Sequence, residues 1–247
     1  MSDTLTIDDL TFIVRRSARR TTVGITVDRD GELLIDAPAD CPDATIHAIA
    51  YERRLWVYQK LAEKALLSHP PVVKEFVDGE GFPYLGRSHR LALVDPPAPQ
   101  SGELRPPLKL HQGRFQLRRD ALPRAREHFV DWYGAHARFW LDSRLKPWAE
   151  RIGVQPKRLA IRDLGYRWGS CGSGGLNFHW RSIMLPPQII DYLIAHELVH
   201  LHEPSHSSAF WQLLARVMPD YDDRRRWLAE QGGRFALGET EKAVGGY

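Results

Sequence analysis

The stretch IIDYLIAHELVHLH at residues 189–202 decides the fold class of this 247-residue sequence. Its hydrophobic residues predict a helix, and this helix contains the pattern H-E-x-x-H, formed by His196, Glu197 and His200. Residues four apart lie on nearly the same helix face, so both imidazoles can point at one Zn²⁺ ion. Glu197 directly follows the first histidine and can deprotonate a water that the metal activates. The pattern therefore predicts a catalytic zinc site.

A catalytic zinc site needs a third protein ligand and one open position. His202 lies only two residues past His200, so on a continuing helix it would point away from the metal. Glu203 is closer to the right face, but it precedes Pro204, where we expect the helix to end. His206 follows that break, and the chain can turn back to present its imidazole. We favour His206 as the third ligand, with Glu203 as the alternative.

The rest of the sequence predicts an α+β protein. Short β-branched and hydrophobic runs predict strands at 10–16, 21–28, 32–38, 74–79, 84–95, 108–112, 114–119, 158–164 and 176–185. Helical patterns cover 44–67, 122–152, 189–202, 208–218 and 222–230, and Pro147 is expected to break or kink the second of these helices. The glycine-rich segment 165–175 predicts a loop, and DRDG at 28–31 predicts a turn.

These elements suggest two regions and a tail. Residues 1–110 form an N-terminal β-rich region with one helix, and residues 111–236 form the catalytic core. Residues 237–247 are expected to be a flexible tail. We find no internal repeat in the sequence.

The composition is that of an ordinary globular protein, with 43% hydrophobic and 26% charged residues. The first residues carry no positively charged leader, and no run approaches the ~18 apolar residues of a membrane span. The two cysteines, Cys41 and Cys171, do not form a C-x-x-C metal pair and are too few for a disulfide scaffold. We therefore expect a cytoplasmic protein without a membrane partner.

Nucleic acid is a weaker candidate partner. The net charge is +3, and the arginines at 15, 16, 19 and 20 form a small basic cluster. Such a cluster is more typical of a solvated surface than of a phosphate-binding patch. The sequence also has no zinc-finger pair, helix-turn-helix pattern or long basic tail.

The segment from RWGSC (167–171) to HSSAFW (206–211) resembles the YgjP-type (DUF45) zinc metallopeptidase family, which is related to SprT-like and minigluzincin proteases. The strand LNFHW (176–180), the Leu-Pro pair before the helix and HELVH carry the same resemblance. Further matches are the openings RRSARRTTVGITVDRDGELLIDAP and FVDGEGFPYLGRSHRL, so the resemblance covers most of the chain.

The resemblance implies a zincin-like catalytic core, in which a small sheet packs on the HExxH helix, and it supports His206 as third ligand. It also implies that the strand at 176–180 is a sheet edge on which an extended peptide pairs. Five residues in and before that strand are candidate substrate contacts: Trp168, Ser170, Leu176, Asn177 and Phe178.

The sequence thus predicts a zinc-dependent metallopeptidase with Zn²⁺ as cofactor, Glu197 as general base and a peptide or unfolded protein as substrate. Two alternatives stay open: a zinc hydrolase of a non-peptide substrate, such as a nucleotide phosphoanhydride, and a DNA-associated SprT-like protein. Tyr221 and His179 are candidate oxyanion donors, although both also fit structural roles.

Overall fold

The structure is a computed structural model that describes residues 3–27, 32–67, 73–97, 106–165, 167–172 and 175–238, without the side chains of 62–67. The chain divides into two compact units, Met1–Ser68 and His69–Tyr247. The boundary lies after the first helix and not at residue 110, because the second sheet packs with the helix that follows it. The predicted turn at 28–31 and the tail beyond residue 238 lie outside the described residues. Leu237 is only 3% exposed, so the tail does not begin there.

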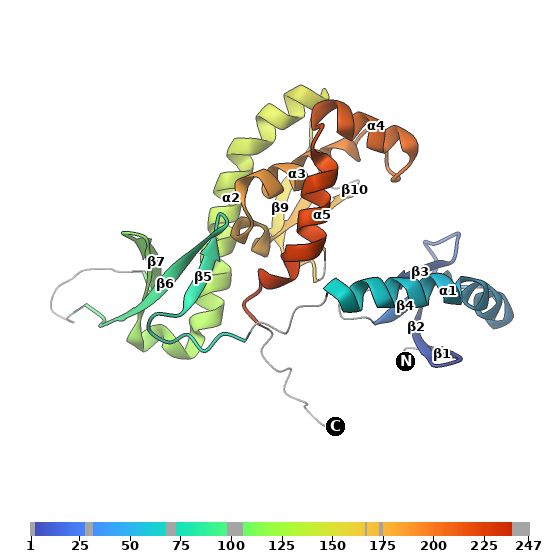
Figure 1. The fold of residues 1–247 in the computed structure, drawn as a ribbon, viewed down its shortest axis with the longest axis horizontal. Coiled ribbons are helices and arrows are strands. Elements are labelled where there is room, and N and C mark those ends of the chain that lie inside the picture. Colours follow the sequence, from blue (N-terminus) through green and yellow to red (C-terminus); the bar gives the residue numbers. More distant parts are fainter. Residues whose placement is uncertain are drawn as a thin grey trace. The chain divides into compact units, whose positions relative to one another are not determined.

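The N-terminal unit is a four-stranded sheet followed by one helix (Figure 1). Its strands are β1 (Asp3–Ile7), β2 (Leu10–Ser17), β3 (Gly24–Val27) and β4 (Leu33–Pro38), in the order β1-β2-β4-β3. The outer pairs are antiparallel and the central pair β2–β4 is parallel. Helix α1 (Asp43–Leu67) supplies Ile46, Ala50 and Val57 to a core that also contains Phe12 and Ile35. The unit therefore has a hydrophobic core of its own.

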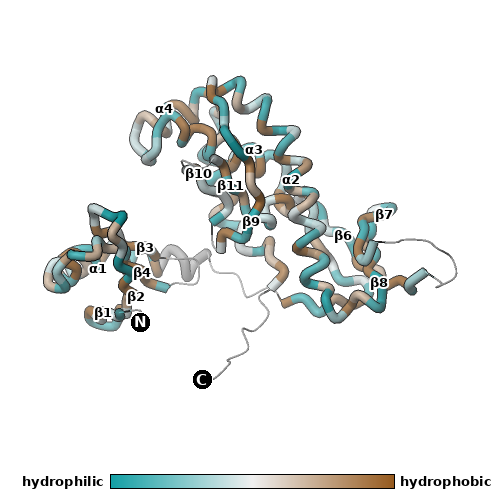
Figure 2. Tube along the Cα trace, turned by 180° about the vertical axis from the view of Figure 1, so that it is seen from behind, coloured by the Kyte–Doolittle hydropathy of each residue, from teal (hydrophilic) through white to brown (hydrophobic). Residues whose placement is uncertain are grey.

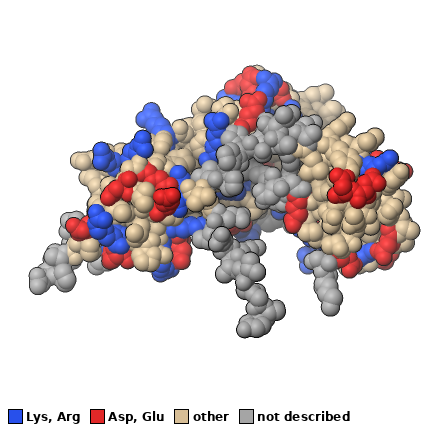
Figure 3. All heavy atoms as spheres, turned by 60° about the horizontal axis from the view of Figure 1, so that its bottom comes forward, with Lys and Arg blue, Asp and Glu red and all other residues tan. Residues whose placement is uncertain are grey.

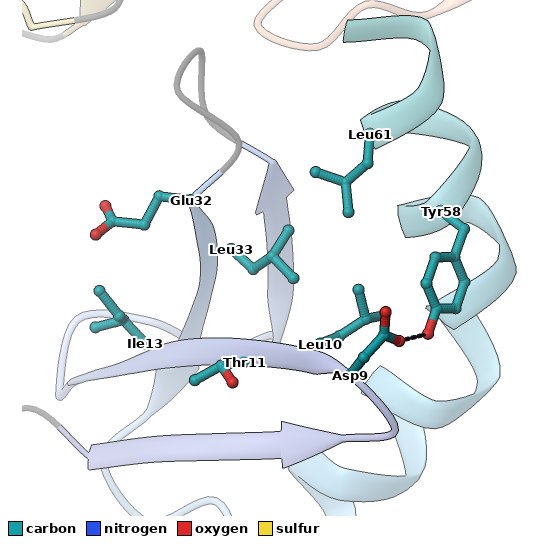
Figure 4. Close-up of a pocket in the computed structure, with 8 residues that line it drawn as sticks. All are labelled: Asp9, Leu10, Thr11, Ile13, Glu32, Leu33, Tyr58 and Leu61. Carbon is teal, nitrogen blue, oxygen red and sulfur yellow. Dashed lines mark hydrogen bonds between the residues drawn. The ribbon is translucent and has the colours of Figure 1, made fainter. Parts of the chain in front are cut away.

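A hollow of about 500 Å³ lies between β2, β4 and α1 of this unit (Figure 4). Leu33 and Leu61 extend toward one another across it. At its rim, the hydroxyl of Tyr58 donates a hydrogen bond to the carboxylate of Asp9. All of its lining residues belong to the N-terminal unit.

The second unit begins with a sheet of the same topology. Strands β5 (Gly81–Tyr84), β6 (Arg87–Val94), β7 (Leu108–His111) and β8 (Arg114–Arg118) lie in the order β5-β6-β8-β7. Again the outer pairs are antiparallel and the central pair is parallel. The short η2 (Arg119–Arg124) leads into α2 (Ala125–Ile152). Both units thus open with the same ββββα arrangement, a repeat that the sequence does not reveal.

Helix α2 is continuous through Pro147, so the predicted break is wrong. The helix contacts the second sheet on one side and the elements that follow it on the other (Figure 1). Packing on two sides offsets the cost of an interior proline, about 3 kcal/mol in an isolated helix. Figure 2 shows both hydrophobic and hydrophilic residues along α2.

The remaining elements form a three-stranded sheet and three helices. Strands β9 (Leu159–Arg162), β10 (Gly169–Gly172) and β11 (Gly175–His179) lie in the order β10-β11-β9. They are followed by η3 (Trp180–Met184), α3 (Pro187–Val199), α4 (Ser208–Val217), α5 (Tyr221–Gln231) and η4 (Gly232–Arg234). The α+β fold class is therefore as predicted. Of the described helices, none is long and apolar enough to cross a membrane.

Two predictions for this sheet are wrong. The glycine-rich segment is not only a loop, because Gly169–Gly172 pairs antiparallel with β11 as strand β10. The strand around Leu176 is not an edge, because β11 lies between β10 and β9. Pairing of strands uses main-chain groups, so a run such as Gly-Ser-Cys-Gly can form an edge strand without the β-branched residues that usually signal one.

Candidate metal centre and active site

Helix α3 carries the H-E-x-x-H pattern at its C-terminal end. Pro187 occupies its first turn, where a missing backbone N–H costs nothing. The helix ends at Val199, earlier than predicted, but His200 at the cap keeps helical angles of φ −61° and ψ −16°. His200 therefore stays on the same face as His196. A tighter turn follows, in which the Leu201 N–H bonds to the Leu198 carbonyl at 3.0 Å.

Three histidines converge at this end of α3. Ligand nitrogens of His196, His200 and His206 all lie within 4.8 Å of one another. The Nε2 atoms of His196 and His206 are 3.0 Å apart. Two imidazole nitrogens bound to one tetrahedral Zn²⁺ would be about 3.3 Å apart, given Zn–N bonds of 2.0–2.1 Å. The three residues therefore fit a small tetrahedral metal ion.

The chemical state of the histidines also fits a metal. Burial, reinforced by the other two histidines, lowers the pKa of His196 to about 3, and burial with the nearby His200 lowers the pKa of His206. Both shifts favour the neutral ring, the form in which histidine binds a metal. The Nδ1–H of His200 donates to the carbonyl of Glu203 at 3.0 Å, which leaves Nε2 with its lone pair toward the other rings.

The alternative ligands lie elsewhere. Glu203 uses its backbone carbonyl to orient His200, and its carboxylate is not part of the histidine group. His202 points away from the group, as predicted, with its Nε2 at 3.3 Å from the carbonyl of Ile152. The structure therefore brings together the three histidines that the spacing and the Pro204 break favoured.

Helix α4 begins just after His206 and packs against the three histidines. The Ser207 hydroxyl caps this helix by accepting a hydrogen bond from the Phe210 N–H at 3.3 Å. This cap fixes the direction in which the chain leaves His206. The fully buried ring of Phe210 then lies 4.9, 4.5 and 4.8 Å from the rings of His196, His200 and His206.

The side chain of Glu197 extends from α3 toward the edge strand β10. It is only 5% exposed. A Cβ atom added to Gly169 of β10 would stand 2.6 Å from a carboxylate oxygen of Glu197, so only glycine allows this approach. Burial raises the pKa of Glu197 to about 8, and the charge of Arg167 opposes this rise. A metal cation bound by the three histidines would favour the ionised carboxylate of Glu197, the form that accepts a proton.

The predicted substrate contacts need correction. Leu176 and Phe178 have no exposed surface, and they face α3 from the central strand. Trp168 is 8% exposed, and its ring packs against Gly232. Since these three side chains are in the core, they cannot touch a substrate in this conformation.

The other two predicted contacts lie on the opposite side of the sheet. Ser170 and Asn177 are a cross-strand pair, and the Asn177 amide donates to the Ser170 hydroxyl at 3.3 Å. Successive residues of a strand face opposite ways, so these side chains point away from the face on which Gly169 meets Glu197. The part of this segment that reaches the site is the main chain of β10.

The candidate oxyanion donor His179 is a structural residue. It is 1% exposed, its Nδ1 accepts from the Arg181 N–H at 3.1 Å, and its Nε2 lies 3.2 Å from Asp163. Tyr192 is a neighbour of the metal group that the sequence reasoning missed, with its ring 5.7 Å from His196. It precedes His196 by four residues, so the helical spacing that linked the two histidines would also have found it.

A comparison with known families agrees with this geometry. A family model described as "YgjP-like, metallopeptidase domain" matches residues 21–231. The chain belongs to the YgjP-like metallopeptidase family. The match extends over most of both compact units and includes the three histidines and Glu197. The α+β arrangement described above is consistent with the zincin-like fold of such enzymes.

Among solved structures, the crystal structure of the metallopeptidase zymogen of Pyrococcus abyssi abylysin is similar to part of the chain. The two are 23% identical, the likeness covers 37% of this chain and 95% of that one, and the TM-score is 0.34. A search of curated proteins found no match. The family membership identifies a metal-dependent hydrolase.

Proposed function

We propose that this YgjP-like protein is a zinc-dependent peptidase that binds its metal through His196, His200 and His206 and uses Glu197 as general base. One observation carries the proposal: three imidazoles meet beside a buried carboxylate, directly under the edge strand of a sheet. Three histidine nitrogens leave one tetrahedral position for the reaction, as in catalytic zinc sites. An all-imidazole set also suits zinc better than it suits Mg²⁺ or Ca²⁺.

In this mechanism zinc, when bound, lowers the pKa of water and polarises the scissile carbonyl. Glu197 takes a proton from the attacking water and delivers it to the leaving nitrogen as the C–N bond breaks. Its carboxylate can serve both steps because α3 and β10 hold it in one place. The glycine at 169 brings the strand main chain close to the carboxylate and limits the access of other water.

Strand β10 supports an extended peptide as substrate. Within the part of the chain that the structure describes, no strand pairs with its outer edge. A substrate segment can therefore add to the sheet through main-chain hydrogen bonds, which hold a peptide without reading its side chains. An unfolded protein exposes such segments, and a folded one does not.

The nucleic-acid alternative gains no comparable support. On the face drawn in Figure 3, basic and acidic side chains are interspersed, with no extended area of one sign among the described residues. Arg15 and Arg20, part of the basic cluster in the sequence, both pair with Asp36. Such pairing reduces the charge available to phosphates.

The substitution Glu197→Gln tests the base. It keeps the shape of the side chain but removes its basicity, so we expect zinc content to stay and peptide hydrolysis to fall by about 10²–10⁴-fold. Zinc analysis and cleavage of a permanently unfolded protein measure the two quantities. Glu203→Gln is the matched control and should hydrolyse normally. Full activity in Glu197→Gln would remove this residue from the mechanism.

The third ligand is tested by zinc occupancy after dialysis. His206→Ala should lose most of the bound zinc, because two histidines alone hold the ion weakly. Glu203→Ala should keep it, since only the backbone of Glu203 meets the metal group. The reverse order would assign the third ligand to Glu203.

A further inference from the structure

We infer that Trp211, supported by Tyr221 and Arg225 of α5, is a positioning residue that orients the third histidine and so sets how tightly the site holds its metal. None of the three residues is a candidate ligand. The inference rests on the proposed zinc site and goes beyond it, because it assigns part of the metal affinity to α4 and α5, two helices that carry no ligand.

The three side chains form a group beside His206, in which Trp211 contacts His206, Tyr221 and Arg225. The ring of Trp211 is nearly parallel to that of His206, with 5.4 Å between centroids and 20° between planes. On Trp211, Tyr221 stacks at 5.6 Å and 22°. The guanidinium of Arg225 lies over the same indole, 5.1 Å from its centroid. We call this set the Trp211 stack.

His206 depends on such support more than its two partners do. The backbone of His196 is fixed within α3 and its ring is mostly buried, and the Nδ1 of His200 is held by the Glu203 carbonyl. His206 lies in the exposed connection between α3 and α4. Within the described residues, its hydrogen bonding is confined to the Nε2 that faces His196. Its ring orientation therefore rests on packing, and of the described rings near it the indole of Trp211 lies closest to parallel.

Helix α5 is anchored firmly enough to serve as a support. Arg224 donates to the carbonyl of Gln188, at the start of α3, at 2.9 Å. The Tyr221 N–H bonds to the Met218 carbonyl at 3.0 Å, and Met218 is a buried core residue. The same helix that carries two of the histidines thus also holds the stack that orients the third. This also gives Tyr221, a candidate oxyanion donor in the sequence, a packing role.

Removal of the indole should weaken zinc binding by lowering the fraction of His206 rings that face the other nitrogens. Loss of groups that orient a metal ligand typically costs about 10–100-fold in affinity. We expect a loss of this size for Trp211→Ala, measured on the full chain by competition between the protein and a zinc chelator. Trp211→Phe should recover most of the affinity, because a flat ring can still stack. Tyr221→Ala should act in the same direction with a smaller effect.

Arg225 and Arg226 provide a matched pair. Both form ion pairs with Asp222, but only Arg225 covers the indole. Arg225→Ala should therefore raise the zinc dissociation constant measurably, and Arg226→Ala should leave it unchanged. This comparison keeps the test decisive even if Trp211→Ala fails to fold, which thermal unfolding of the metal-free variants would reveal.

The result that would overturn the inference is wild-type zinc affinity in folded Trp211→Ala, or equal effects of the two arginine substitutions. The His206→Ala variant separates this failure from failure of the site itself. If His206→Ala loses zinc while Trp211→Ala does not, the site stands and the role of the stack is wrong. If His206→Ala also binds normally, the proposed metal site is wrong and the inference falls with it.

Discussion

Sheets β1–β4 and β5–β8 have the same strand order, the same pairing and the same following helix, yet only the second belongs to the unit with the three histidines. The N-terminal sheet closes a separate core with α1. The second sheet and α2 share one continuous core with α3 and α4. The same topology therefore closes a separate core in the first unit and joins the core of the metal site in the second. The two sheets differ in the helix that follows each of them and in their first turn.

Helix α2 is buried on more than one side. Phe129 packs on Phe82 of the second sheet at 4.1 Å between centroids, and the Tyr133 hydroxyl donates to the Pro83 carbonyl at 2.8 Å. Further along, Ala137 and Leu141 are fully buried. Helix α1 instead contributes its buried residues Ile46, Ala50 and Val57 to the separate core of the N-terminal unit. A helix with a second apolar face can join its sheet to another layer, and α2 does so for the metal site.

The turns show the same contrast. In the β5–β6 turn, the N–H groups of Leu85 and Gly86 bond to the carbonyls of Ile183 and Met184, each at 2.9 Å. This turn therefore docks onto η3, just before α3 begins. The matching β1–β2 turn, at Asp8 and Asp9, instead borders the hollow of the N-terminal unit.

The largest expected effect comes from the two cores. Phe129→Ala and Phe12→Ala each remove a fully buried ring, at a cost of about 3–5 kcal/mol. Because Phe129 shares its core with α3, its loss should also weaken zinc binding, whereas Phe12→Ala should leave zinc binding intact. Residue-resolved hydrogen exchange and zinc titration measure both effects. A loss of zinc affinity in Phe12→Ala would show that the stability of the N-terminal core is coupled to the metal site.

A smaller effect is expected at two glycines in matching turns. Gly86 and Gly113 have nearly the same backbone, with φ of +77° and +75°, so alanine costs about 1–2 kcal/mol at either position. At Gly86 the new Cβ would also stand 2.9 Å from Pro186, and nothing lies within 4 Å at Gly113. Gly86→Ala should therefore destabilise by about 1–3 kcal/mol more than Gly113→Ala. Urea unfolding compares them, and equal losses would mean that the docked turn is not tightly held.

The helical part of the site could be predicted because helical spacing is local. His196 and His200 share a face through the 3.6-residue period alone, and the break at Pro204 was enough to favour His206. The exact end of α3 could not be predicted, because the turn after Val199 depends on hydrogen bonds that close only in three dimensions. That difference moved the helix end by several residues without moving the histidines off their common face.

The sheet could not be predicted equally well, because strand order is a long-range property. Nothing local shows that β10 lies outside β11, and Gly169 to Gly172 carries no strand signal. The repeat of ββββα was hidden for a similar reason: the two cores use different side chains, and the second core contains a cluster of contacting aromatic rings that includes Phe82, Phe115 and Phe129. The contact between Gly169 and Glu197 could not be predicted, because it joins a strand that the sequence does not indicate to a helix that the sequence does indicate.

The smallest effect is expected from ion pairs, which offer the finest test of how each sheet is used. Arg144 of α2 binds Asp191 of α3 through two hydrogen bonds of 3.0 and 2.5 Å, and the Asp191 side chain is 11% exposed. Asp36 pairs with Arg15 within the N-terminal sheet, where the carboxylate is 22% and the arginine 52% exposed, against 11% and 45% for Asp191 and Arg144. Asp191→Asn should cost about 1–3 kcal/mol of unfolding free energy, because it weakens a charged, mostly buried hydrogen bond between two helices. Asp36→Asn should cost less than about 1 kcal/mol, because water screens an exposed pair. Urea unfolding at low and high salt separates the two, since the more exposed pair should respond more strongly to salt. If both variants lose equal stability and respond equally to salt, the pair between α2 and α3 is no stronger than a surface contact, and the attachment of α2 to α3 rests on apolar packing.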